Sequence, residues 1–233
     1  MAARTRREDA LSRERIIDAA VEMLDAGGEG GLTFRALSAH LKTGAGAIYW
    51  HVANKSELLI AAGNAVLAPV LTAEAADETP EDAIRALALG IFDAIDAHPW
   101  VGSELSRSVS PSAMLRIFER IGRQIQALGV PAAGQFAVAT ALLNYIIGVG
   151  RQNAAQAADV EPGTNRPAVL GAVAAAWGKL DPDEFPFIQS IAAQLPGHDD
   201  REQFLAGVDL FLAGISSVRR PLPRQPARTS TPG

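Results

Sequence analysis

The sequence contains no cysteine among its 233 residues, so disulfide frameworks and zinc sites built on thiolates are excluded. Aromatic residues are also scarce, at 6% of the chain, although hydrophobic residues reach 48%. The core must therefore be built from Ala, Leu, Val and Ile. No strand pattern competes with helical periodicity, and no repeat of about 20–50 residues is visible. The length favours a small domain joined to a larger one.

Catalytic motifs are missing as well. The 4 histidines do not form HExxH or another paired-ligand spacing, and GxSxG, a P-loop and GxGxxG are all absent. An all-helical enzyme would need a positioned nucleophile, base or metal site. We therefore expect no enzyme activity, no cofactor and no metal site.

Net charge is −5, and its distribution says more than its size. The first 60 residues contain 8 Lys and Arg and 8 Asp and Glu, so the whole deficit lies beyond them. This balance argues against a protein that coats nucleic acid. The N-terminus leads into a charged helix, with no apolar secretory signal, which favours the cytoplasm.

One uncharged stretch, between Arg123 and Arg151, is long enough to suggest a membrane span. Gln124, Gln135 and Asn144 interrupt it, and much of the remainder is alanine. We interpret it as a buried helix that is apolar on more than one face and needs two partners, one of which a second subunit can supply.

The most informative stretch runs from Thr33 to Lys55. Thr33 can cap a helix, and Phe34, Leu37 and Leu41 then form one apolar face. Lys42-Thr43-Gly44 breaks this pattern, with a glycine that tolerates a turn conformation.

A second short helix follows this turn. Ile48 and Val52 are expected to point inward, while Tyr49, Trp50 and His51 occupy the exposed side. An alternative has Trp50 packed inward against the next helix. Two short helices joined by a tight turn form a helix-turn-helix, whose second helix can lie in the DNA major groove.

These residues resemble a known family. Gly31-Leu32-Thr33-x-Arg35-x-Leu37, followed by Ile48-Tyr49-Trp50-His51-Val52-x-Asn54-Lys55, is similar to the DNA-binding domain of the TetR family of transcriptional repressors. The resemblance covers about Arg13 to Ala62. It implies an all-α fold, with an N-terminal three-helix helix-turn-helix DNA-binding domain and a larger C-terminal helical ligand-binding and dimerisation domain.

The candidate DNA-binding residues follow from side-chain chemistry and from this resemblance. Arg35 can donate two hydrogen bonds to guanine or to a phosphate, and Thr33, Tyr49, His51 and Lys55 carry donors suited to phosphate oxygens. The resemblance places the four residues from Gly44 to Ala47 at the base-facing start of the recognition helix, where none has a side-chain hydrogen-bonding group. Direct readout must then rest on Arg35, Tyr49, Trp50, methyl groups and DNA shape. The complete set is Thr33, Arg35, Thr43, Gly44, Ala45, Gly46, Ala47, Tyr49, Trp50, His51 and Lys55.

Cap and proline signals predict the remaining helices. The first helix begins at Ser12 and is expected to stop at Gly27-Gly28. Later starts are expected at Thr79-Pro80, Ser110-Pro111, Pro131, Ala168, Asp181-Pro182 and Asp199 or Asp200, whereas His98-Pro99-Trp100 reads as a break. These signals divide the chain into a basic arm (1–11), a helix-turn-helix domain (12–54), a connecting helix (55–76), a helical ligand-binding and dimerisation domain (77–220) and a proline-rich disordered tail (221–233).

The resemblance implies a homodimeric repressor that binds a palindromic double-stranded operator and is released by a small-molecule effector. The helices Pro131–Ala157 and Asp200–Val218 would pair with their counterparts in the second subunit. A helical adaptor that binds protein instead of DNA is the alternative, and no membrane partner is expected. Large or polar residues on the helices that should line the effector pocket are Phe92, Trp100, Met114, Phe118, Asn144, Tyr145, Gln152, Trp177 and Phe187.

Overall fold

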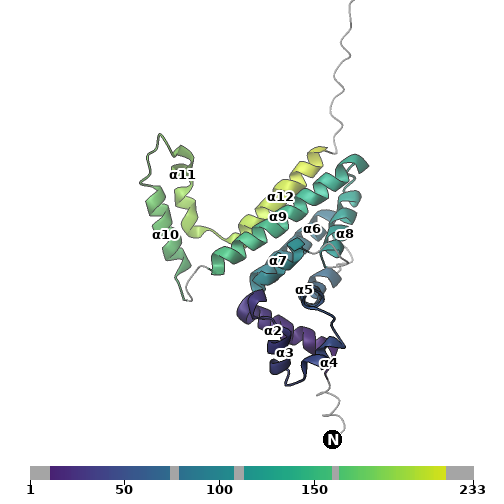
Figure 1. Cartoon of the computed structure of the whole chain (residues 1–233). Coiled ribbons are helices and arrows are strands. Elements are labelled where there is room, and N and C mark those ends of the chain that lie inside the picture. The colour runs from purple at the N-terminus through teal and green to yellow at the C-terminus, as the bar shows by residue number, and fades with distance from the viewer. Residues whose placement is uncertain (1–10, 74–78, 108–112, 159–162, 219–233) are drawn as a thin grey trace, which may run out of the picture.

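The structure, a computed structural model, describes residues 11–73, 79–107, 113–158 and 163–218. Nearly all of the predicted basic arm, the predicted tail and the Ser110-Pro111 start lie outside these ranges. The described residues form helices and no strands, and a small group of helices precedes a larger one (Figure 1), which confirms the predicted fold class.

Three helices at the N-terminal end form a unit that we call the head, and a fourth helix leads away from it. The head lies at the lower end of the molecule in Figure 1, with α5 above it. These helices are α2 (Arg13–Gly31), α3 (Phe34–His40), α4 (Ala45–Tyr49) and the connecting α5 (Lys55–Thr72).

The larger part, which we call the body, packs around α9, which contacts four other body helices. The body consists of α6 (Pro80–Ala97), α7 (Pro99–Arg107), α8 (Ala113–Ala127), α9 (Ala132–Ala158) and α12 (Asp200–Val218).

Between α9 and α12 in the sequence, the chain forms a helical arm that projects to one side of the body (Figure 1). None of the residues in α10 or α11 is buried. The arm consists of α10 (Arg166–Trp177), α11 (Pro186–Ile191) and the 3-10 helix η1 (Ala192–Gly197).

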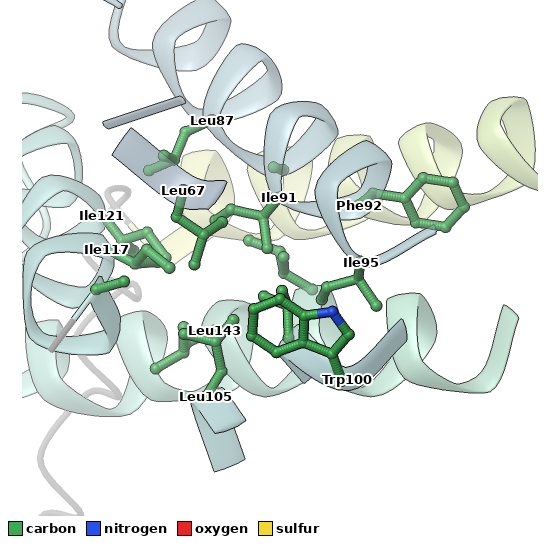
Figure 2. Packing of buried hydrophobic residues seen from close by; sticks show 14 of the residues in the cluster. Leu67, Leu87, Ile91, Phe92, Ile95, Trp100, Leu105, Ile117, Ile121 and Leu143 are labelled. Atoms are coloured by element: carbon green, nitrogen blue, oxygen red, sulfur yellow. The ribbon is translucent and has the colours of Figure 1, made fainter. Parts of the chain in front are cut away.

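One hydrophobic core runs from the head through α5 into the body. Leu67 of α5, Ile91 of α6 and Ile117 of α8 are all fully buried, and Figure 2 shows them packed together with Leu143 of α9. Because this core is continuous and close-packed, a change in the packing of the body can change the orientation of the head.

Several predicted helix starts are confirmed by side-chain caps. The side chains of Thr33, Asn54 and Thr79 accept hydrogen bonds from the backbone N–H groups three residues later. Pro80 occupies the first turn of α6, as predicted, where a missing N–H costs nothing.

The predicted interruptions of the helices are confirmed at two places. The first helix is broken at Gly28, which is non-helical (φ 59°, ψ −167°), although a further helical turn continues to Gly31. His98 separates α6 from α7 as predicted, but the start of a new helix at Pro99 was not predicted. One expectation was wrong: the Asp181-Pro182 signal does not start a helix, because the Asp181 carboxylate accepts from Asp183 N at 2.9 Å in a local turn.

Among the described helices, only α9 is long and apolar enough to cross a membrane, and 22% of its most apolar 18-residue segment is buried. It packs against α6, α7, α8 and α12, which occupy one side of it. The opposite side exposes small and apolar residues, including Phe136, Ala137 and Ala141. The expected buried helix is therefore covered on one face only, and a second partner for the open face stays a prediction.

Candidate nucleic-acid interface and effector cavity

The head places α3 and α4 as a helix-turn-helix. Leu37 and Ile48 are fully buried and Val52 is almost so, which anchors both helices against α2 and α5. The turn between them is closed by a hydrogen bond of 2.9 Å from Thr43 N to Ser38 O. The left-handed residue of this turn is Lys42 (φ 52°), whereas Gly44 is extended (φ −79°), so the expected role of Gly44 in the turn was wrong.

The exposed side of α4 carries the aromatic residues predicted to meet DNA. Tyr49 is 54% exposed and Trp50 is 90% exposed, which excludes the inward alternative for Trp50. The Tyr49 ring stacks on Phe34 of α3 with ring centroids 4.5 Å apart. This stack holds the Tyr49 phenol on the outer surface. The sequence predicted Phe34 only as part of the apolar face that it forms with Leu37 and Leu41.

The other predicted DNA-binding residues differ in exposure. Thr33, Arg35, Gly44, Ala45 and Gly46 are exposed, and Thr43, Ala47, His51 and Lys55 are half-buried. The Lys55 ammonium donates to the backbone oxygen of Glu29 at the end of α2. A phosphate contact by Lys55 must therefore use its remaining donors or replace this bond.

The junction between α4 and α5 is fixed by a reciprocal cap. Asn54 Oδ1 accepts from Glu57 N, and Glu57 Oε2 accepts from Ala53 N, each at 2.9 Å. Arg13 of α2 adds an ion pair to the same carboxylate at 3.2 Å. The Ala53 N–H, and then Arg13, lower the pKa of Glu57. Helix α4 thus has a defined position relative to α2 and α5.

Polar contacts also tie the head to the body. Asp25 of α2 accepts from Trp100 Nε1 at 2.7 Å and lies 2.8 Å from His98 Nδ1. Glu29 pairs through both carboxylate oxygens with Arg107 of α7. Trp100, predicted as an effector contact, therefore lies at the head–body junction, with its ring in the core (Figure 2) and its N–H on the head.

Glu104 of α7 is the one buried charged residue in the described part of the chain, at 4% exposure. Its Oε1 has no hydrogen-bond partner among the described residues. Burial, the largest cause, raises the pKa of Glu104, and Arg107 opposes this shift. A carboxyl of this kind favours its neutral form.

We expect Glu104→Gln to raise protein stability near pH 8 and to have little effect near pH 4. The folded pKa exceeds the unfolded one, so the contribution of Glu104 to stability is complete below the unfolded pKa and is lost as pH rises through the folded pKa. Thermal unfolding at both pH values measures this difference. Glu119→Gln on α8, which removes an exposed carboxylate paired with Arg123, is the matched control. An equal change at both pH values would contradict the burial argument.

In the body, three predicted effector residues lie together. Phe92 of α6 and Tyr145 and Gln152 of α9 line a cavity of about 250 Å³, closed on another side by Phe204 of α12. The Tyr145 hydroxyl donates to Phe204 O at 3.0 Å, and burial raises the pKa of Tyr145.

A second hollow, of about 790 Å³, lies between the end of α9 and the arm, and Trp177 lines it. It shares Gln156 and Asp200 with the first cavity, so the two adjoin. The polar lining residues Asn153, Gln156 and Gln203 were missed, although Gln152, Asn153 and Gln156 stand close together in the sequence on the last turns of an apolar helix.

The remaining predicted effector residues lie elsewhere. Met114 and Phe118 of α8 are half-buried and pack against the core. Asn144 is exposed on α9, and Phe187 is 71% exposed on the arm.

Comparison with known proteins places this arrangement in context. The family model described as bacterial regulatory proteins, tetR family, matches residues 16–62. An HTH-type transcriptional regulator of Saccharopolyspora erythraea is 31% identical over 146 residues, which are 62% of this chain and 61% of that protein. An HTH-type transcriptional repressor of Streptomyces coeruleorubidus is 29% identical over 145 residues, or 60% of this chain and 53% of that protein. The match thus spans less than two thirds of each of these two relatives.

A solved structure gives a longer match. The structure of a TetR transcriptional regulator from Streptomyces coelicolor aligns with a TM-score of 0.82 and 52% sequence identity. The alignment covers 91% of this chain and 100% of that one.

Proposed function

Because the chain belongs to the TetR family of bacterial regulatory proteins, which are DNA-binding transcriptional regulators, we propose that it is a cytoplasmic repressor. It binds a palindromic operator as a homodimer, and a small-molecule effector in the body releases it. The observation that carries this proposal is the outward face of the helix-turn-helix, where Trp50 is 90% exposed beside a Tyr49 ring fixed by stacking.

The exposed residues of the head support a division of labour on DNA. The guanidinium of Arg35 on α3 donates two hydrogen bonds to guanine or to a phosphate. Tyr49, Thr33 and His51 contact phosphates and so fix the position of the head along the DNA. The glycine and alanine residues at the start of α4 let its backbone approach the bases closely, while methyl contacts and DNA shape add to the readout. We assign residues 12–54 to this domain, 55–76 to the connecting helix and 77–220 to the effector and dimerisation domain.

Dimerisation is supported by an apolar groove between α9 and α12. The groove has a volume of about 580 Å³ and is lined by Ala137, Ala141, Leu210 and Gly214 among others. Small residues permit close approach of a second helix pair, and Leu210 is 75% exposed. Two heads placed about 34–36 Å apart can read two half-sites on one side of the duplex.

Effector release is supported by the cavity that contains Phe92, Tyr145 and Gln152. Its aromatic walls and amide donors suit a flat, largely apolar molecule with a polar edge. Phe92 belongs to α6, which ends at Ala97, and His98 and Trp100 just beyond this end contact Asp25 of the head. A shift of α6 on effector binding would therefore move the head, and effector and DNA would weaken each other reciprocally, by a coupling of about 1–3 kcal/mol.

We expect selection from random duplexes to recover a palindromic motif, and Arg35→Ala to weaken binding to it by about 1–3 kcal/mol per head. Fluorescence anisotropy at several salt concentrations measures the loss, and a lower salt slope would assign Arg35 to phosphate. Arg116→Ala on α8, which removes an exposed arginine of the body, is the control. Recovery of no motif at low salt, with Arg35→Ala equal to the parent, would support the adaptor alternative.

A further inference from the structure

A separate cavity of about 390 Å³ lies at the head–body junction, away from the effector cavity. Its walls come from the end of α2, the first turns of α5 and the end of α7. Leu59 and Ile60 form its apolar side, and Glu104 lines it together with Glu29, Lys55 and Arg107.

Two of the three charged neighbours of Glu104 are cations, and both bond to Glu29. Arg107 pairs with the Glu29 carboxylate, and Lys55 donates to the Glu29 backbone oxygen. Glu104 is 4% exposed, and its Oε1 has no partner within the described residues. A buried acceptor without a donor is unfavourable, so this carboxyl has an unused capacity to bind a donor group.

The chain also makes room for this carboxyl. Gly63 lies inside α5, where glycine weakens a helix. A Cβ atom at this position would lie 3.2 Å from Glu104 Oε2 and 3.5 Å from Cδ. The helix therefore keeps a glycine at the point where the carboxyl approaches its backbone.

We propose that this cavity is a second ligand site, which binds a small organic amine. The ammonium group donates to Glu104, and the hydrocarbon part lies against Leu59 and Ile60. An amine fits better than an anion because the carboxylate is the buried group, whereas Arg107, whose side chain is 55% exposed, is already paired with Glu29.

This site lies between α5 and α7, and its occupant would touch both the connecting helix and the body. An amine bound there would alter the contacts that hold the head, in addition to any effector in the body cavity. Amine binding itself does not depend on the proposed function; only its regulatory consequence rests on it.

The test is a calorimetric titration of the full chain with benzylamine, benzyl alcohol and benzoate near pH 8, where the carboxylate form of Glu104 is more populated than at lower pH. We expect benzylamine to saturate one site per chain and the two other compounds to bind at least about tenfold more weakly. Glu104→Gln should weaken benzylamine binding by about tenfold or more, because it removes the negative charge.

Two further variants make the outcome decisive. Gly63→Ala should also weaken binding, by pushing the carboxyl out of place, and Glu119→Gln should leave it unchanged. Absence of saturable binding, equal affinity for benzyl alcohol, or full affinity in Glu104→Gln would overturn the proposal. Loss in Gln152→Ala with full affinity in Glu104→Gln would place the amine in the body cavity, which overturns the junction site while supporting the effector cavity.

Discussion

Replacing Gly207 with alanine should destabilise the protein by about 2–3 kcal/mol. Gly207 lies in α12 directly against Tyr145 of α9, and a Cβ atom there would lie 1.8 Å from the Tyr145 hydroxyl oxygen and 2.4 Å from Cζ. The ring would have to move and give up its hydrogen bond to Phe204 O. It would also disturb its stacking on Phe204, where the centroids are 5.6 Å apart. These losses exceed the roughly 0.5–1 kcal/mol that alanine gains over glycine inside a helix.

Chemical denaturation at one fixed protein concentration measures this effect, since the stability of the proposed dimer depends on concentration. Gly122→Ala on α8 is the matched control, because among the described residues no atom beyond the neighbouring α8 backbone lies within 4 Å of the added methyl group. It should be neutral or stabilising by up to about 1 kcal/mol. In a Tyr145→Ala background, Gly207→Ala should cost almost nothing. An equal cost in both backgrounds would show that the contact with Tyr145 is not responsible.

Local chemistry made the head predictable from sequence. Thr33 and Asn54 announce the starts of α3 and α5, because each side chain can accept from an N–H three residues ahead, and both do so. Ile48 and Val52 have the spacing of an inward face, and both are buried. The stack between Phe34 and Tyr49 could not be read from periodicity, since it bridges two helices across the turn.

The body was less predictable because similar local signals have different outcomes there. Thr79-Pro80 starts a helix, whereas Asp181-Pro182 forms a turn in which the aspartate accepts from Asp183 N. Pro99 was interpreted as a stop, although a proline is equally suited to the first position of a new helix, and α7 begins there.

The contacts that join head and body had no local signal at all. Trp100 and Asp25 are 75 residues apart, and only the packing of α7 against α2 brings them together. The burial of Glu104 also depends on contacts between distant segments. Its sequence neighbours give no indication of burial, which results from the approach of α7 to Gly63 of α5.

Replacing Leu210 with arginine should convert the proposed homodimer to a monomer. Leu210 is 75% exposed and lines the apolar groove between α9 and α12 together with Ala137 and Ala141. In a two-fold interface each substitution occurs twice, so two arginines would be buried against apolar surface without a partner. The fold of each chain should persist, because Leu210 contributes little to the core of the monomer.

Sedimentation velocity measures the change in mass, and anisotropy measures its consequence for DNA. A monomer binds one half-site at a time, so affinity for the palindrome should fall by about 10²–10⁴-fold, whereas affinity for an isolated half-site should be retained. Leu115→Arg, which replaces a 45% exposed leucine on α8 outside the groove, should leave both mass and DNA affinity unchanged. If Leu210→Arg remained dimeric, the subunits would have to meet through another surface. If it became monomeric with undiminished affinity for the palindrome, two linked heads would not be the basis of operator recognition.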